Sequence, residues 1–220
     1  MIRQAFAVFR HGATLLAVAA LGGGLHAQAE SPSELFREGV QLFFDAKPVE
    51  SAERFDALIT ADPTAKPELW QRGLSLYYAD RFEDGREQFE SHRSVNPNDV
   101  ENPAWHFACV ARLEGLEAAR EQMLPVGPDR RVPMREIIAY YRGEGTPAEI
   151  LAAAEAGDDA GRRNRLCYAH LYLGLFAEAT GDREAAKQHI RLAAGRYAMD
   201  HYMGRTAQVH ATLRGWEPAE

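Results

Sequence analysis

Three things that this chain has little of limit what it can be. Among its 220 residues only Cys109 and Cys167 are cysteines, too few for a disulfide framework and without metal-site spacing. β-Branched residues are sparse and long alternating runs are absent, so strands are not expected. The formal charge of −7 leaves no basic excess, which argues against binding nucleic acid non-specifically.

Motifs that carry catalysis are also absent. No His-Glu-x-x-His occurs, and no two of the histidines beyond residue 29 stand four residues apart. A glycine-rich phosphate loop and a Gly-x-Ser-x-Gly elbow are lacking too. A metal site built across helices stays open as an alternative. The sequence therefore predicts a protein that is not an enzyme, with no catalytic residues, no cofactor and no metal.

The N-terminus has the features of a targeting segment. Arg3 and Arg10 supply positive charge, and a short apolar run from Ala13 to Leu21 follows. Ala27-Gln28-Ala29 has the small-x-small form that signal peptidases cleave. We expect residues 1–29 to be a secretory signal peptide, so the protein is exported, either to a periplasm or out of the cell. The run is too short to span a bilayer, and no integral membrane span is expected.

The stretch from Ser33 to Pro97 repeats itself. Four kinds of position recur at an offset of 34 residues: Gly39 as Gly73, Ser51 as Gly85, Phe55 as Phe89, and Pro63 as Pro97. The small residues let two helices approach closely, the rings fill the space between them, and each proline ends a unit because it lacks a backbone donor. A 34-residue period with these residues is typical of the tetratricopeptide (TPR) repeat, a pair of antiparallel helices.

Carrying this spacing along the chain predicts an all-α fold, an α-solenoid of the TPR type with about five helix pairs. The solenoid domain covers 30–220, with repeats at about 32–65, 66–99, 101–128, 132–157 and 162–199 and a C-terminal capping helix at 201–214. The third pair loses residues in its inner turn, and Pro125-Val126-Gly127-Pro128 breaks the chain after it. The fourth pair is degenerate, although Thr146 and Glu149 form a capping box. In the fifth, Gly174 and Ile190 take the places of Gly73 and Phe89.

The cysteines are predicted to be two buried thiols. Export would permit a disulfide. However, Cys109 and Cys167 are expected on the first helices of the third and fifth pairs, with a whole pair between them. Neighbouring helices already stand ~8–10 Å apart, beyond the ~7 Å Cα limit for a bridge.

Several segments resemble the NlpI-type TPR lipoproteins of bacterial envelopes. They are the run from Arg72 to Tyr78, Asn96-Pro97-Asn98-Asp99, Tyr140-Tyr141, and Tyr172-Leu173-Gly174 leading into Gly181-Asp182. The similarity covers about Ser33 to Leu213 in the same order of pairs. It implies an adaptor, often a homodimer, that brings a cell-envelope hydrolase or protease together with other proteins. The chain lacks the lipid-bearing cysteine of that family, so the resemblance does not extend to a membrane anchor.

In a TPR stack the first helix of each pair lines a concave groove. Positions three before and four after the small anchor are candidates to face it: Phe36, Phe43, Trp70, Tyr77, Trp105, Arg112, Leu171 and Glu178. Aromatic side chains there would hold a partner helix or extended peptide. The alternative for each ring is packing between repeats. Arg112 is the exception, because arginine is almost never buried unpaired.

Two functions are compatible with these patterns. The first is a non-catalytic exported scaffold that binds a protein partner in its concave groove. The alternative is an envelope enzyme or small-ligand-binding protein, whose site would lie between the 125–128 loop and the C-terminal helices.

Overall fold

The computed structural model describes residues 30–220, and the predicted signal peptide at 1–29 lies outside them. Every element in the described part of the chain is a helix. The order is α1 (Pro32–Phe44), α2 (Pro48–Ala61), a 3₁₀-helix η1 (Pro63–Glu68), α3 (Trp70–Tyr78), α4 (Phe82–His92), α5 (Glu101–Glu114), α6 (Leu116–Glu121), α7 (Met134–Arg142), α8 (Pro147–Glu155), α9 (Asp159–Ala179), α10 (Arg183–Ala194) and α11 (Tyr202–Arg214). The all-α prediction is confirmed, and consecutive helices pack in adjacent pairs, which is compatible with an α-solenoid.

The predicted anchors meet inside their pairs. A Cβ added at Gly73 would lie 2.4 Å from the Phe89 ring. The same atom would lie 2.9 Å from the Phe55 ring at Gly39, and 2.7 Å from Ile190 at Gly174. Since real Cβ atoms do not approach that closely, only glycine lets the second helix seat its large side chain against the backbone of the first. The pairs α1–α2, α3–α4 and α9–α10 thus share one packing device.

Two predicted boundaries move. The second repeat was predicted to begin at about residue 66, whereas α3 begins at Trp70. Pro63 and Pro67 hold the intervening residues in the 3₁₀-helix η1, because prolines four apart cannot supply α-helical hydrogen bonds. The third repeat was predicted to extend to about residue 128, whereas its second helix, α6, ends at Glu121. Elsewhere the expected local chemistry is present, and Thr146 with Glu149 forms the capping box that opens α8.

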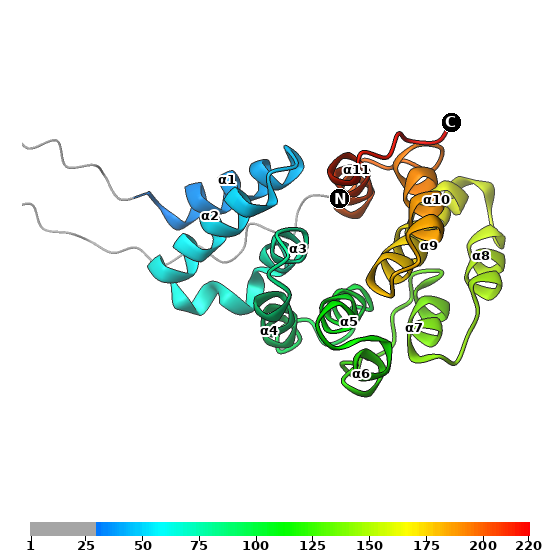
Figure 1. Ribbon diagram of the computed structural model, residues 1–220, viewed down its shortest axis with the longest axis horizontal. Coiled ribbons are helices and arrows are strands. Elements are labelled where there is room, and N and C mark those ends of the chain that lie inside the picture. The colour runs from blue at the N-terminus through cyan, green and yellow to red at the C-terminus, as the bar shows by residue number, and fades with distance from the viewer. Residues whose placement is uncertain (1–29) are drawn as a thin grey trace, which may run out of the picture.

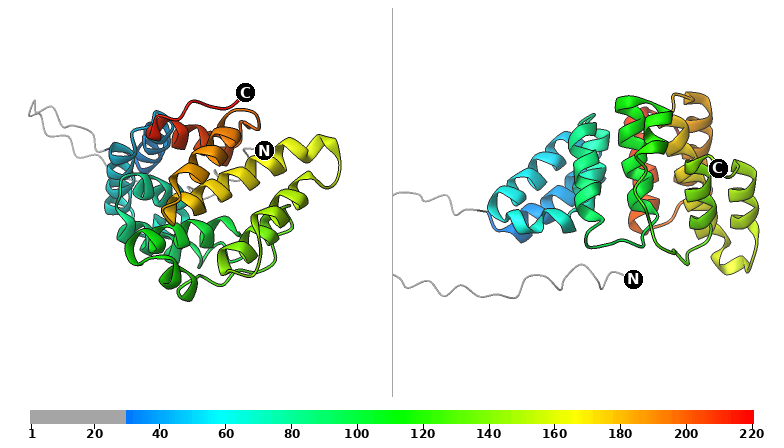
Figure 2. Two further views of the ribbon diagram at one scale, coloured as in Figure 1. Left: turned by 45° about the vertical axis from the view of Figure 1, so that its right-hand side comes forward. Right: turned by 90° about the horizontal axis from the view of Figure 1, so that it is seen from below.

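The pairs follow an arc, and the last helix lies inside it. Figure 1 shows the chain running from α1–α2 through α3–α4 and α5–α6 to α7–α8 and α9–α10, with α11 returning toward α1. Helix α11 packs on α10 and contacts both α9 and α1. The views in Figure 2 show the same arrangement, with α7–α8 at the far end from α1–α2. The predicted capping helix therefore closes the curve from within, against both its first and last pairs.

Burial divides the core into two parts. A small cluster, Leu35, Phe55, Leu58 and Leu69, holds α1 to α2. A large cluster runs through the remaining pairs and includes α11. Cys109 and Cys167 are both buried in the core and free, as the two predicted thiols. Within residues 30–220, no helix is long and apolar enough to cross a membrane.

Candidate binding site

The eight residues predicted to face the groove have different surroundings in the structure. Phe43, Tyr77, Trp105 and Leu171 are buried, each with at most 1% of its surface exposed. Phe36 and Trp70 are half-buried. The two charged residues, Arg112 and Glu178, keep 33% and 12% of their side chains exposed. Most of this predicted surface is therefore covered within the chain itself.

Helix α11 provides the cover. The Tyr202 ring lies 6.1 Å from Phe43, 4.6 Å from Phe44 and 4.6 Å from Trp70, measured between ring centroids. One turn from the other end of α11, His210 Nδ1 lies 3.0 Å from the hydroxyl of Tyr78. Aromatic pairs of this geometry contribute ~0.5–1.5 kcal/mol each beyond their buried area. The chain thus places its own last helix where the sequence predicted a partner.

Beneath α11, four first-helix side chains form a continuous aromatic layer. Trp105 lies 5.5 Å from Tyr77, 5.9 Å from Tyr78 and 6.5 Å from Tyr172, each near edge-to-face. The hydroxyl of Tyr77 donates to Glu178 across 3.0 Å. This layer joins α3, α5 and α9.

Helices α3, α5, α9 and α11 run in the same direction. Residues earlier in each helix line one pocket, and residues at or just after each C-terminal end line another. Trp70 and Trp105 line the pocket at the N-terminal ends, which we call the α11 entry pocket. Arg112 and Glu178 line the pocket at the C-terminal ends. Four of the eight predicted residues therefore border a cavity, two at each end of the aromatic layer.

The C-terminal pocket has a volume of about 330 Å³ and mixed charge. Arg214 donates to Glu178, and His210 Nε2 lies 3.3 Å from the same carboxylate. Although burial opposes it, His210 and Arg214 hold the pKa of Glu178 well below its usual range. Arg112 stands 4.5 Å above the Phe82 ring, 3.8 Å from Asp80. Glu178 is thus a structural ion-pair centre, rather than a residue that presents a free charge.

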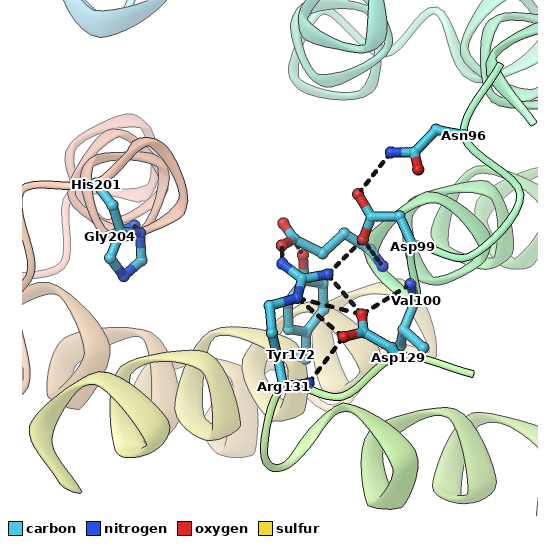
Figure 3. Close-up of polar contacts among 9 residues, drawn as sticks. Asn96, Asp99, Val100, Asp129, Arg131, Tyr172, His201 and Gly204 are labelled. Carbon is cyan, nitrogen blue, oxygen red and sulfur yellow. Dashed lines mark hydrogen bonds and ion pairs between the residues drawn. The ribbon is translucent and has the colours of Figure 1, made fainter. Parts of the chain in front are cut away.

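The α11 entry pocket is larger, about 410 Å³, and has an ion-pair network on one wall. Arg131, from the loop between α6 and α7, pairs with Asp99, Glu101 and Asp129. Figure 3 shows this network on one side of the view and His201 of α11 on the other. The Arg131 guanidinium also lies 5.8 Å from the Tyr168 ring, which stacks on His201 at 4.9 Å. The loop after the third pair therefore forms part of a site with the last helix.

Glu101 is the most perturbed acid of this network. Burial and the neighbouring Asp99 raise its pKa to about 7, although Arg131 and the Tyr172 hydroxyl, which donates across 3.0 Å, favour the charged form. Asp129 has the opposite shift: hydrogen bonds from Arg131 outweigh burial and lower its pKa. Three carboxyl groups thus share one guanidinium, and no positive charge in the network is left free for an anion.

Several polar atoms around this pocket have no partner. They are Asn102 Oδ1, Trp105 Nε1, His201 Nε2 and the Tyr202 hydroxyl, four of the nine unpartnered buried side-chain atoms found in residues 30–220. An unsatisfied buried polar atom costs about 1–3 kcal/mol. Their gathering at one cavity distinguishes it from the C-terminal pocket, which has one such residue near it, His210, and that one lies within reach of Glu178.

Sequence reasoning missed the residues that make the entry pocket. Arg131, Glu101, His201 and Tyr202 lie outside the anchor spacing, and no local pattern places the start of α11 beside the N-terminal end of α5. Only the alternative hypothesis pointed to this region, since it placed a site between the 125–128 loop and the C-terminal helices. The pocket lies between α11 and Arg131, three residues beyond that loop.

Within residues 30–220, no group of three or more His, Cys, Asp or Glu side chains could hold a metal ion. The chain matches no protein-family model. Its function is therefore argued from its own surfaces.

Proposed function

We propose that this protein is a non-catalytic, exported adaptor of the TPR type that binds a protein partner on its inner face. The recurring contact of a glycine on the first helix with a large side chain on the second supports the TPR assignment. It recurs within two consecutive pairs, α1–α2 and α3–α4, and again within α9–α10 much further along the chain, as copies of one unit would. The 34-residue period of the first two pairs supports it independently.

One surface feature carries the adaptor proposal. Phe36, Val40 and Phe43 share one face of α1, since they stand four and three residues apart. Helix α11 covers the end of this stripe at Phe43, where Tyr202 packs, while Phe36 and Val40 continue beyond it and stay half-exposed. The stripe is apolar and partly exposed, although Phe36 and Val40 also pack against the α1–α2 core, where the Phe36 ring lies 6.0 Å from that of Phe55. An amphipathic partner helix would extend the contact that α11 begins.

The segment that precedes α1 supports the same function. The features of residues 1–29 are those of a secretory signal peptide, and the chain that follows carries more acidic than basic residues. The partner we infer is therefore a protein of the cell envelope, a hydrolase or protease by resemblance, with a second copy of this chain completing a homodimer. Binding to nucleic acid is not part of the proposal.

The test is affinity capture from envelope extract with three forms of the protein. Phe36→Ala removes the half-exposed ring, and Val49→Ala is the matched control, because Val49 is 52% exposed on the second helix α2. Substitution of Trp105 is unsuitable as a test of the surface, because this residue is 1% exposed and its loss would disturb the core. Circular dichroism and thermal melting establish that each variant is folded.

The expected result is a specific protein retained by the native and Val49→Ala forms and lost, or reduced about tenfold, with Phe36→Ala, the change expected from losing one central aromatic anchor. A folded Phe36→Ala variant that keeps every partner would contradict the α1 surface. Size-exclusion chromatography with light scattering, applied to the same preparations, decides between monomer and homodimer.

A further inference from the structure

The first turn of α11 carries a covering side chain and a titratable cap in neighbouring residues. Tyr202, the first residue of the helix, covers rings of α1 and α3, and His201 caps the helix just before it. We propose that this turn is an acid-sensitive cover, which loosens when His201 takes up a second proton and uncovers the rings beneath Tyr202. The regulatory role of the cover rests on the adaptor function proposed above, whereas its response to acid can be tested without a partner.

The cap at the start of α11 requires a neutral histidine. The backbone N–H of Gly204 donates to His201 Nδ1 across 3.1 Å, so this nitrogen carries no proton and the ring proton lies on Nε2. A charged imidazole has a proton on both nitrogens and cannot accept this hydrogen bond. Its charge would also stand at the N-terminal end of a helix, where the helix dipole disfavours cations. Protonation of His201 therefore removes the cap and destabilises the first turn.

The position of Tyr202 depends on the backbone of this turn. The chain before α11 folds tightly over the helix start, because a Cβ added at Gly204 would lie 2.2 Å from the carbonyl oxygen of Met199. Besides the cap, the backbone N–H of Arg205 donates to the carbonyl of His201 across 3.0 Å. The Tyr202 hydroxyl has no hydrogen-bond partner among residues 30–220, so packing alone holds its ring in place. A loosened first turn therefore carries the ring away with it.

The surroundings of His201 oppose its protonation. Tyr168 of α9 stacks on the ring at 4.9 Å, and the Arg131 guanidinium lies 5.8 Å from Tyr168. Burial, then Arg131, lowers the pKa of His201, while Asp200 acts in the opposite direction. Burial raises the pKa of both Tyr168 and Tyr202, so neither ring brings a charge. The other titratable groups around this pocket are Asp99 and Glu101 near the start of α5, Asp129, which pairs with Arg131, and His92 of α4.

Acid favours the loosened turn. The pKa of His201 is lower in the closed turn than the value of about 6.5 for a free histidine, so the loosened turn binds the proton more tightly. The closed turn is therefore favoured above about pH 6.5, and this preference is lost as the pH falls. Glu101 acts in the same direction, because its pKa of about 7 means that its negative charge, which would attract a charged His201, is lost over the same interval.

Loosening the cover would lengthen the apolar surface of α1. Tyr202 packs on Phe43, Phe44 and Trp70, and Phe43 ends the stripe that begins at Phe36. A partner helix that docks on the stripe competes with Tyr202 for these rings. Acid weakens the competitor, so a partner that reaches the rings would bind more tightly as the pH falls.

The experiment is amide hydrogen exchange of the full chain at pH 8 and pH 5, read at the Gly204 amide that donates to the cap. Protection factors are compared, because they correct for the intrinsic pH dependence of exchange. At pH 5 a histidine with an ordinary pKa of about 6.5 is almost fully protonated, so Gly204 protection is expected to fall roughly tenfold in the native chain. Binding of the apolar dye ANS at the same two pH values measures exposure of the rings.

Two variants identify the residue that senses acid. His201→Asn supplies a preferred N-cap that cannot be protonated, so Gly204 protection should be equal at both pH values and ANS binding should rise less than in the native chain. His201→Ser, a second neutral cap, makes the same test if asparagine disturbs the packing against Tyr168. His189→Asn on α10 is the matched control. It removes a titrating group from the separate contact with His170 and should keep the native response at Gly204.

Equal Gly204 protection at pH 8 and pH 5 in the native chain would overturn the proposal. A fall that persists in both His201 variants would also overturn it, and so would one that disappears in His189→Asn, because the histidine pair would then be the sensor. Loss of protection without a rise in ANS binding would show that the rings stay covered. Failure of partner capture through Phe36 would leave all these outcomes unchanged, since none of them requires a partner.

Discussion

At the scale of single residues, the buried position of Glu101 disfavours the charged form of its carboxyl. Its carboxyl is buried against two other acids, and its pKa of about 7 lies well above the value of 4.5 that an unfolded chain gives it. The native state therefore holds a proton between about pH 4.5 and 7 that the unfolded state releases. Stability from this group is complete below pH 4.5 and is lost as the pH rises through 7.

Glu101→Gln should remove that dependence. The amide keeps the size and can still accept from Tyr172, but it carries no charge at any pH. We expect the free energy of unfolding of the native chain, relative to the variant, to increase by about 2–3 kcal/mol as the pH falls from 8 to 4.5. Urea unfolding across that range measures it. Glu184→Gln, an exposed change on α10, is the control, and a native-minus-variant difference independent of pH would contradict the assignment.

At the scale of elements, α9 and α10 are joined by two histidines whose nitrogens face each other. His170 Nδ1 lies 2.8 Å from His189 Nδ1, so one ring donates from its Nδ1–H and the other accepts on an unprotonated Nδ1, and both rings cannot be protonated there at once. Burial, then the neighbouring His189, lowers the pKa of His170 to about 4, and burial lowers that of His189 as well. Here the unfolded state binds the extra protons, so stability is lost as the pH falls from about 6.5 to 4.

His189→Gln should flatten this loss, since it removes one titrating group and the repulsion that lowers the pKa of the other. The measurement is the melting temperature at pH 7 and pH 4.5 for native and variant chains. The drop between the two pH values should be smaller in the variant by several degrees, the change produced by about 1 kcal/mol in a chain of this size. An equal or larger drop in the melting temperature of the variant would show that protonation of this pair does not destabilise the native state. His92→Gln, on α4 outside this pair, is the matched substitution.

The elements also show what sequence could and could not predict. The pairs α1–α2, α3–α4 and α9–α10 were predictable because Gly39, Gly73 and Gly174 meet their partners within one short hairpin, where sequence spacing fixes contact. The position of α11 was not, because its contacts with Phe43 and Trp70 join residues more than 100 positions apart and carry no periodicity. For the same reason the sequence left Trp105 open between facing the groove and packing between repeats, and the structure buries it. Partner binding, export and dimerisation stay predictions.

At the scale of the whole molecule, α11 couples the two ends of the arc. Tyr202 is the contact point, with rings of α1 and α3 on one side and the entry pocket on the other. An open solenoid would lose only neighbouring contacts when one helix is loosened. In this protein, loosening the last helix should also loosen the rings of α1 and α3 that Tyr202 covers.

Tyr202→Ala tests this coupling by hydrogen exchange. Removal of the ring should cost roughly 2–3 kcal/mol and raise amide exchange in α1 and α3 as well as α11. The control is Tyr140→Ala, whose ring on α7 lies 4.4 Å from Phe176 on α9, and which should raise exchange around α7 and α9 but not in α1. If Tyr202→Ala leaves exchange in α1 unchanged, the two ends are not coupled through α11.

The contact between α11 and α1 also orders the events of folding in time. A chain made from its N-terminus at ~5–20 residues per second completes α11 roughly ten to thirty seconds after α1. During that interval the local hairpins can form, but Phe43 and Trp70 have no Tyr202 to cover them. In the nascent first half, the rings of Phe43 and Trp70 are therefore exposed to water where Tyr202 later covers them. A chaperone that binds apolar segments could bind there until α11 has been made.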